Sequence, residues 1–445
     1  MHDTTKHNSS TEHFLRTIGL LLISLGLLGL LVAATGAEAV SPVWTGLGGM
    51  AAFTAGSLLY IWESRSSRST AQQNNGIWQR SATARGASAW VIGFVLTGFY
   101  VLLYWFPETL QGLIQGVEPL SQWLRGRPAD QWFLYGTFYT LAILIMGVFA
   151  LLKYRNNLYH IIRTISVMFF QLGFAFLLPA LLLFLNRPEF YFSYFWPLKY
   201  DYLFPGTVDY LVRDGAALGV FMVFWGAVFS FLATPVLTYF YGKRWYCSWV
   251  CGCGGLAETA GDPYRHLSDK SRAAWRWEVA IIYPILGFII LTTLLLWINS
   301  WSGGSILGSL SGGFASTYGF FIGAIFSGVV GVGFYPILGN RVWCRFGCPM
   351  AAYLGLLQKH FSRFRITTNG GQCISCGNCS TYCEMGIDVR WYAQQGEPII
   401  RSSCVGCGIC AHVCPRGVLK LENGPREHRY AASPLIRRDD LQILS

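Results

Sequence analysis

The sequence of 445 residues contains little charge. Only 12% of its residues are Asp, Glu, Lys or Arg, about half the share that is usual in soluble domains, and 53% are hydrophobic. This scarcity excludes an ordinary soluble enzyme and indicates a chain that lies largely in a lipid bilayer. The net charge of +11 does not call for nucleic acid, because basic residues in short loops and around Lys359, Arg363 and Arg365 account for it.

Several chemistry-bearing residues are missing from the long apolar stretches. None of the eight histidines lies in the middle of such a stretch, which argues against a haem b within the membrane. Asp214 and Glu278 are the nearest acidic residues and fall at the ends of stretches, which argues against ion translocation by this chain. The sequence also shows no glycine-rich nucleotide-binding loop after a predicted strand and no flavin-carrying domain.

About eight apolar stretches are long enough to cross roughly 30 Å of hydrocarbon. They lie at 14–34, 44–62, 88–106, 131–152, 160–186, 214–240, 277–298 and 317–338. Lys and Arg concentrate in one set of connecting loops, which places those loops and both termini in the cytoplasm. The predicted location is the inner (cytoplasmic) membrane. A signal peptide cut after Ala39 is the alternative to a retained first helix, which we prefer because its apolar run is long.

A motif with two cysteines four residues apart occurs twice, as "GKRWYCSWVCG" at 242–252 and "GNRVWCRFGCP" at 339–349. Each copy follows a stretch that runs from outside to inside, so the last four spans are interpreted as a duplicated helical hairpin. Cysteines four apart share a face if the segment stays helical. The two copies then bring four thiols together at membrane level: Cys247, Cys251, Cys344 and Cys348.

These four membrane thiols are compatible with several occupants. A third iron–sulfur cluster or another soft metal is the favoured interpretation, because four soft ligands suit it. Redox-active dithiol pairs and structural cysteines are the alternatives. Cys253, in the same glycine-rich segment, is a spare thiol that could replace one of the four or be inert.

Eight of the thirteen cysteines lie between residues 373 and 414, in two C-x2-C-x2-C-x3-C runs, "CISCGNCSTYCE" and "CVGCGICAHVCP". At this spacing three cysteines wrap one cubane and the fourth ligates the neighbouring cluster. The predicted ligands are Cys373, Cys376, Cys379 and Cys414 for one [4Fe–4S] cluster, and Cys404, Cys407, Cys410 and Cys383 for the other. Structural zinc usually pairs two separated C-x2-C knuckles instead. Disulfides are disfavoured at a cytoplasmic position.

The segment with these two runs resembles a bacterial-type two-cluster ferredoxin, although Glu384 stands where Pro is more usual. With the paired C-x3-C motifs, residues 160–420 resemble the polytopic membrane ferredoxins, such as those that accompany periplasmic nitrate reductase and nitrous oxide reductase activation. That resemblance implies electron transfer between the quinone pool or cytoplasmic carriers and a periplasmic redox partner. Gly252 departs from the family pattern, which usually has Pro after the second cysteine.

The predicted fold is mainly α: a polytopic helical membrane protein of about eight spans, with a duplicated hairpin and a C-terminal α+β two-cluster ferredoxin domain. The predicted domains are a four-span region of unknown role at 1–155, a four-span core at 156–360, the ferredoxin domain at 361–425 and a tail at 426–445.

The predicted function is that of a membrane-bound iron–sulfur electron-transfer subunit, a component of an oxidoreductase complex rather than a stand-alone catalyst. It relays electrons between clusters at the cytoplasmic face and the quinone pool or a membrane or periplasmic redox partner. The alternative is a redox-sensing or metalloenzyme-assembly protein. His160 and Arg163, at the start of the fifth stretch, are interpreted as an interfacial pair rather than as quinone ligands.

Overall fold

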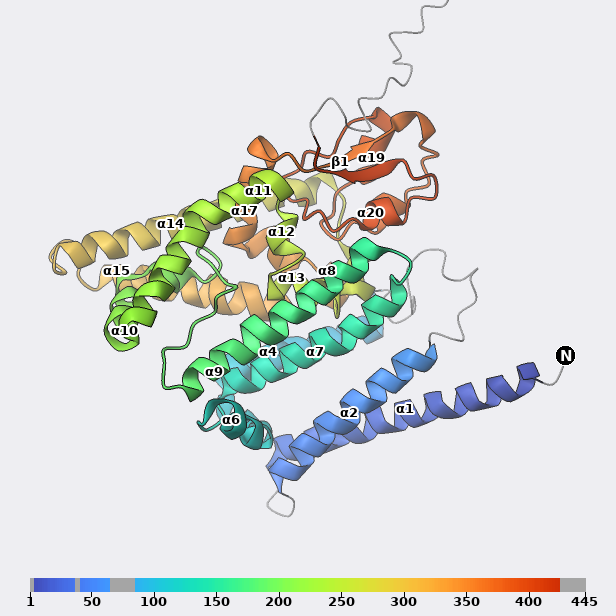
Figure 1. Ribbon diagram of the computed structural model, residues 1–445, viewed down its shortest axis with the longest axis horizontal. Helices are drawn as coiled ribbons and strands as arrows, with labels where there is room; N and C mark the ends of the chain where they lie inside the picture. The colour runs from blue at the N-terminus through green and yellow to red at the C-terminus, as the bar shows by residue number, and fades with distance from the viewer. Residues whose placement is uncertain (1–3, 37–40, 65–84, 425–445) are drawn as a thin grey trace, which may run out of the picture.

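Helices dominate the computed structural model, which describes residues 4–36, 41–64 and 85–424 (Figure 1). The cleavage point proposed after Ala39 and the tail at 426–445 lie outside these residues. The α-helices are α1 (Thr4–Thr35), α2 (Pro42–Ser64), α4 (Ala87–Trp105), α5 (Gln111–Gly116), α6 (Glu118–Arg125), α7 (Gln131–Lys153), α8 (Leu158–Phe169), α9 (Leu178–Phe184), α10 (Pro205–Val228), α11 (Thr234–Tyr241), α12 (Arg244–Cys247), α13 (Gly252–Glu258), α14 (Arg272–Trp301), α15 (Leu310–Tyr318), α16 (Tyr335–Leu338), α17 (Pro349–Phe361), α18 (Asn378–Thr381), α19 (Val389–Gln395) and α20 (Ile409–His412). The strands are β1 (Arg365–Thr368) and β2 (Leu419–Glu422).

Seven helical segments within the described residues are long and apolar enough to cross a membrane. They are Phe14–Thr35, Ala87–Trp105, Gln131–Lys153, Leu158–Phe184, Pro205–Tyr241, Arg272–Trp301 and Leu310–Val330. Helix α2 matches the second predicted span but is not among the seven. The mainly helical membrane fold is therefore confirmed, while the count of eight spans and their topology stay predictions.

Two of the long spans contain π-helical turns directly before a proline. The segment Phe170–Leu177 precedes Pro179, and Phe229–Ala233 precedes Pro235. Proline has no N–H to donate to the carbonyl four residues earlier, and a π-helical turn lets the chain continue as one helix past that point. The first of these turns carries Gln171, which lines the cavity described below.

The C-terminal part is a small α+β domain. Strands β1 and β2 pair antiparallel with Arg365 opposite Glu422, and the one-turn helices α18 and α20 carry cysteines. Gly377 and Gly408 precede these helices with φ of 81° and 80°, a left-handed conformation that favours glycine. The two cysteine runs therefore have the same local geometry, as a two-cluster ferredoxin domain requires.

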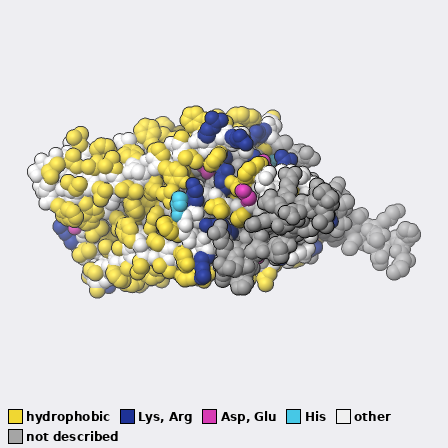
Figure 2. Space-filling model, turned by 90° about the horizontal axis from the view of Figure 1, so that it is seen from above, with side chains coloured by type: hydrophobic (Ala, Val, Ile, Leu, Met, Phe, Trp, Pro, Cys, Tyr) yellow, Lys and Arg dark blue, Asp and Glu magenta, His cyan; other side chains and the backbone are white. Residues whose placement is uncertain are grey.

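The ferredoxin domain rests on one end of the helical bundle, near α8, α11 and α17 (Figure 1). A single hydrophobic core includes Ile282 of α14, Leu354 of α17, Ile366 of β1 and Leu419 of β2. Figure 2 shows hydrophobic side chains covering the left part of one face, with Lys and Arg gathered further to the right. The ferredoxin domain thus packs directly against the helical bundle and shares a hydrophobic core with it.

Candidate metal centres

All thirteen cysteines are free thiols, and the structure groups the eight of the ferredoxin domain into two sets. One pocket is lined by Cys373, Cys376, Cys379 and Cys414 together. Cys376 is exposed, whereas Cys379 is buried and its pKa is raised to about 12 by burial. This first set therefore lies at the surface of the domain, and it is the set that the sequence predicts for one cluster.

The second set lies deeper, against the membrane helices. Burial, followed by the neighbouring thiols of Cys407, Cys404 and Cys383, raises the pKa of Cys410 well above its usual range. Cys404 is also buried, which raises its pKa to about 11. In both sets the fourth cysteine comes from the other run, and the exchange of ligands between the two clusters stays a prediction.

The four membrane cysteines also lie close together, but not on continuous helices. Cys247 ends α12 and Cys344 lies in the π-helical segment Trp343–Gly347, whereas Cys251 and Cys348 have extended backbones and cap α13 and α17. The segments do not stay helical, so the condition for one shared helical face is not met. The residue before a proline avoids the helical region, which explains Cys348 before Pro349.

The two copies nevertheless keep the same backbone geometry. Gly242 and Gly339 have φ of 68° and 95° with ψ near 180°, a region open almost only to glycine. Cys251 has φ −67° and ψ 125°, and Cys348 has φ −85° and ψ 113°. Gly252 in the first copy therefore permits the same backbone conformation at the preceding cysteine as Pro349 does in the second. A Cβ atom at Gly252 would come within 2.5 Å of the Tyr194 hydroxyl.

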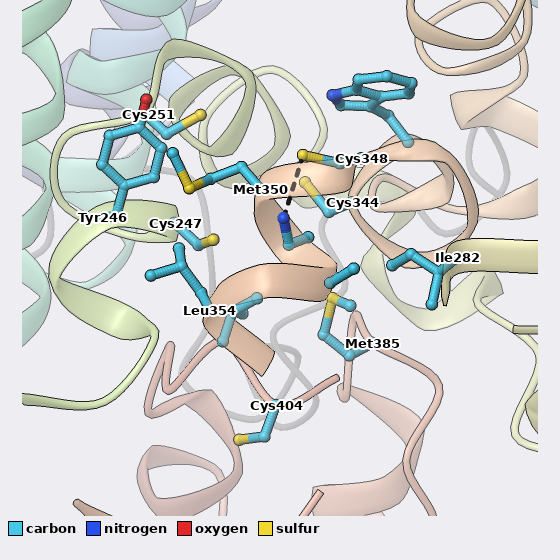
Figure 3. Close-up of a cluster of buried hydrophobic side chains, with 14 of the residues drawn as sticks. Tyr246, Cys247, Cys251, Ile282, Cys344, Cys348, Met350, Leu354, Met385 and Cys404 are labelled. Carbon is cyan, nitrogen blue, oxygen red and sulfur yellow. Dashed lines mark hydrogen bonds between the residues drawn. The ribbon is translucent and has the colours of Figure 1, made fainter. Parts of the chain in front are cut away.

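Figure 3 shows Cys247 and Cys251 on one side of the buried cluster, Cys344 and Cys348 on the other, and Met350 between them. Each of the four thiols is no more than 6% exposed. Burial raises the pKa of Cys348, and the nearby thiols of Cys344, Cys247 and Cys251 raise it further. The four sulfur atoms thus share one apolar compartment.

Zinc and iron–sulfur clusters make different demands on a set of four thiolates. Among the described residues, no three His, Cys, Asp or Glu side chains are grouped closely enough to hold one metal ion. A tetrahedral zinc with Zn–S of about 2.3 Å needs sulfurs about 3.8 Å apart. A cubane takes its four cysteines at four separate irons and therefore fits a wider set of thiols. The chemistry of each donor set in the ferredoxin domain, four thiolates, fits a [4Fe–4S] cluster.

A row of seven buried charged side chains, here called the ion-pair chain, lies between the second ferredoxin set and the membrane cysteines. Cations and anions alternate along it, with successive N–O distances of 2.5, 3.0, 2.9, 3.1, 2.6 and 2.7 Å. None of its side chains is more than 6% exposed. In order, the residues are Lys153, Asp262, Arg265, Glu384, Arg341, Glu258 and Arg163.

The three arginines of the ion-pair chain also contact cysteines. Arg265 Nη1 lies 3.9 Å from Cys407 Sγ, and Arg163 donates to the Cys407 carbonyl. Arg341 Nη1 lies 3.6 Å from Cys344 Sγ and 3.2 Å from the Cys247 carbonyl oxygen. Contacts of this kind orient ligands and tune the group that they hold.

Two of the three acids of the ion-pair chain, Asp262 and Glu384, are held in their charged form, whereas burial raises the pKa of the third, Glu258. Burial alone would raise the pKa of Asp262, but Lys153 and Arg265 lower it to about 2. Burial would likewise raise the pKa of Glu384, but Arg265 and Arg341 are the main groups that lower it to about 2. The carboxylates of Asp262 and Glu384 are therefore counter-charges to Arg265 and Arg341 at neutral pH.

Most of the ion-pair chain was not recognised from the sequence. His160 and Arg163 were expected to be an interfacial pair, yet both are 1% exposed and covered by the ferredoxin domain. The unusual Glu384 after Cys383, and the arginine shared by the two repeats, were the available signals.

A cavity of about 750 Å³ extends from the other end of the bundle towards the membrane cysteines. Its lining includes Arg125 and Lys199 at the far end, and Cys253, Trp343 and Pro349 next to the C-x3-C motifs. Many of its walls are tyrosines: Tyr104, Tyr135, Tyr139, Tyr191, Tyr194, Tyr200 and Tyr318. A pocket of this size, mostly aromatic with a few polar groups, is typical of small-molecule binding.

Comparison with protein-family models identifies the chemistry of the cysteine sets. A "4Fe-4S dicluster domain" matches residues 372–418, and a "4Fe-4S binding domain" matches 220–271 and 318–367. This chain is an iron–sulfur protein. The predicted ferredoxin domain and its [4Fe–4S] clusters are confirmed, and the second match covers both copies of the membrane repeat.

Two curated proteins resemble the chain in part. YccM of Escherichia coli (strain K12), provisionally named an electron transport protein, is 27% identical over 171 residues, which are 33% of this chain and 43% of YccM. The methylamine utilization ferredoxin-type protein MauN of Methylobacillus flagellatus is 24% identical over 166 residues, 35% of this chain and 54% of MauN. The chain thus spans about half the length of these relatives. No solved structure matches it.

Proposed function

We propose that the protein is a membrane-bound electron-transfer subunit that relays electrons between its ferredoxin domain and a redox partner in the membrane. The main support for this proposal is that the buried interior of the ferredoxin domain is continuous with that of the helical bundle. One core and the ion-pair chain join the second ferredoxin set, the membrane cysteines and the inner end of the cavity. The names of YccM and MauN support the same role.

The proposed ligands are the two ferredoxin sets given above, and bound [4Fe–4S] clusters supply one-electron oxidation and reduction. Cys373, Cys376, Cys379 and Cys414 form the outer set, where a soluble carrier has access. The inner set is buried against the arginines. The protein's own contribution is to exclude water, orient thiols and place charge beside sulfur.

We further propose that the four membrane cysteines hold a third iron–sulfur cluster. All four are buried in one compartment and Arg341 contacts one of their sulfur atoms. Redox-active dithiol pairs and a soft-metal site are the competing proposals. Iron and acid-labile sulfide on protein purified without oxygen distinguish them: about twelve irons per chain indicate three clusters, and about eight indicate two.

The membrane partner is proposed to be a quinone whose head group enters the tyrosine-lined cavity. The Gln171 Oε1 atom is buried without a hydrogen-bond partner among the described residues, and it and the Tyr194 hydroxyl both lie close to Gly252, which follows Cys251. A hydroxyl donor beside a quinone carbonyl would orient the ring. The ferredoxin domain is proposed to face the cytoplasm, in agreement with the loops that carry Lys and Arg.

The test is reduction of the purified, oxygen-free protein by a quinol, followed by EPR. We expect prompt reduction that added quinone reverses. The relay is refuted if dithionite reduces the clusters but neither a quinol nor a soluble ferredoxin does so on the same time scale, an outcome that would favour the redox-sensing or assembly role.

A further inference from the structure

The ferredoxin domain itself does not require an acidic residue at the position of Glu384. The two cysteine runs end differently in this chain, the second in Cys414–Pro415 and the first in Cys383–Glu384. Pro415 borders the outer thiol pocket. Glu384 is instead fully buried against the membrane core, where its carboxylate meets residues from both halves of the repeat.

The carboxylate of Glu384 holds two arginines at once. Its Oε2 atom lies 2.9 Å from Arg265 Nη1, and its Oε1 atom lies 3.1 Å from Arg341 Nη2. Asn340 donates to Oε2 at 3.3 Å, and Ser268 donates to the Glu384 carbonyl at 2.7 Å. The group is therefore fixed by contacts from two segments that are far apart in the sequence.

Each of these arginines reaches a cysteine sulfur of a different set. Arg265 approaches Cys407 of the inner ferredoxin set at 3.9 Å, and Arg341 approaches Cys344 of the membrane set at 3.6 Å. One carboxylate thus connects two N–H···S contacts. A protein sets the reduction potential of an iron–sulfur cluster through hydrogen bonds to sulfur and through nearby charge. A purely structural anchor would not need both arginines to face sulfur.

We infer that Glu384, with Arg265 and Arg341, is a positioning device that sets the reduction potential of the inner ferredoxin cluster and links it electrostatically to the membrane cysteines. The carboxylate offsets the positive charge of two guanidinium groups beside sulfur. It therefore holds the potential lower than the arginines alone would. The inference rests on the inner cysteine set holding a [4Fe–4S] cluster and does not require a quinone partner.

The first test is Glu384→Gln, which keeps the shape and one acceptor oxygen while removing the charge. Arg265 keeps its ion pair with Asp262 and Arg341 keeps its pair with Glu258, so the variant is expected to fold. Redox titration followed by EPR on oxygen-free protein should show the inner cluster easier to reduce. We expect about a tenfold rise in its one-electron reduction equilibrium constant, which is about 59 mV.

Glu278→Gln is the matched control. Glu278 is also a buried acid in an ion pair with an arginine, Arg345, at 2.7 Å, and it lies at the same boundary between membrane and ferredoxin parts. The contacts of Arg345 include the Asp269 carbonyl but no cysteine sulfur among the described hydrogen bonds. The control removes the same charge without a contact to a cysteine sulfur and should shift the potential of the inner cluster by less than Glu384→Gln does.

Arg265→Gln gives a second, opposite test. It removes the positive charge and the contact to Cys407, so the potential should fall, whereas Glu384→Gln should raise it. Opposite shifts with iron content retained support the inference. The inference is overturned by unchanged potentials in both variants, by shifts of the same sign, or by an equal shift in Glu278→Gln. If Glu384→Gln loses iron, Glu384→Asp must restore the wild-type potential, and failure to do so also overturns it.

These outcomes are separate from the proposed function. A quinol that fails to reduce the protein would refute the relay to a quinone, yet the potentials of the variants could still shift as expected. Unchanged potentials in a protein that a quinol reduces promptly would instead leave the relay standing and remove the role of Glu384.

Discussion

Neutralising Asp262 should loosen the contact between the ferredoxin domain and the membrane bundle. Asp262 is fully buried and joins Lys153 at 2.5 Å to Arg265 at 3.0 Å, while the Tyr154 hydroxyl donates to it at 2.8 Å. The variant Asp262→Asn keeps the volume and removes both ion pairs. Loss of one partner from a buried pair is costly, because the remaining charge has already been taken out of water.

The size of the effect follows from the pKa. Burial opposes the charged form, yet Lys153 and Arg265 lower the pKa of Asp262 from its usual 3.8 to about 2. At 1.36 kcal/mol per pH unit this difference corresponds to about 2.4 kcal/mol. Because the pKa is lowered in the folded state, the stabilisation is present above about pH 4 and is lost as the pH falls towards 2. At about 2 °C per kcal/mol, we expect thermal unfolding about 5 °C lower at neutral pH.

The assay is thermal unfolding of the purified, detergent-solubilised protein at about pH 7 and about pH 5, where the difference between variant and wild type should be the same. Asp269→Asn is the control, since it removes an exposed carboxylate seven residues away and should change stability by no more than about 0.5 kcal/mol. The reasoning fails if Asp262→Asn unfolds at the wild-type temperature, or if both variants lose the same amount.

Three further predictions concern the cysteines, the ferredoxin turn and the cavity. Replacing Cys247 and Cys344 together with Ser should remove about four irons and leave the EPR signals of the ferredoxin domain intact; unchanged iron would exclude a membrane cluster. Gly408→Ala should destabilise the domain by more than about 1 kcal/mol, measured by thermal unfolding, because φ is 80° and the new Cβ would lie 3.0 Å from Tyr159. Tyr194→Phe should slow reduction by a quinol at least tenfold but not reduction by dithionite, whereas the exposed Tyr210→Phe should slow neither.

The ferredoxin ligands could be predicted from the sequence because the cluster dictates local spacing. Three cysteines within seven residues, as in Cys404, Cys407 and Cys410, can be recognised without knowing any tertiary contact. Gly242 and Gly339 could also be recognised in the sequence, because each satisfies a backbone requirement of its own segment and does not depend on tertiary contacts. Helical spans were visible because their length is set by the bilayer.

The ion-pair chain could not be predicted, because its partners come from segments that only the fold brings together. Lys153 and Asp262 are 109 residues apart, and Glu258 and Arg341 are 83 apart. Glu278 was placed at a helix end, where water would be expected to solvate it, but the ferredoxin side of the bundle covers it and Arg345 pairs with it. Burial of this kind depends on the packing of a whole domain.

The composition of the ion-pair chain supports an electrostatic role over a purely adhesive one. Buried ion pairs often stabilise a fold no better than apolar side chains of similar volume. Here four basic side chains alternate with three acids, so positive charge is in excess in a buried region flanked by cysteine sulfurs. Unit charges about 10 Å apart interact by about 1.7 kcal/mol at an effective dielectric constant of about 20, enough to shift an equilibrium more than tenfold. Because Glu384 bridges the arginines that face Cys407 and Cys344, this one carboxylate contributes to the electrostatic potential at both sulfur sets.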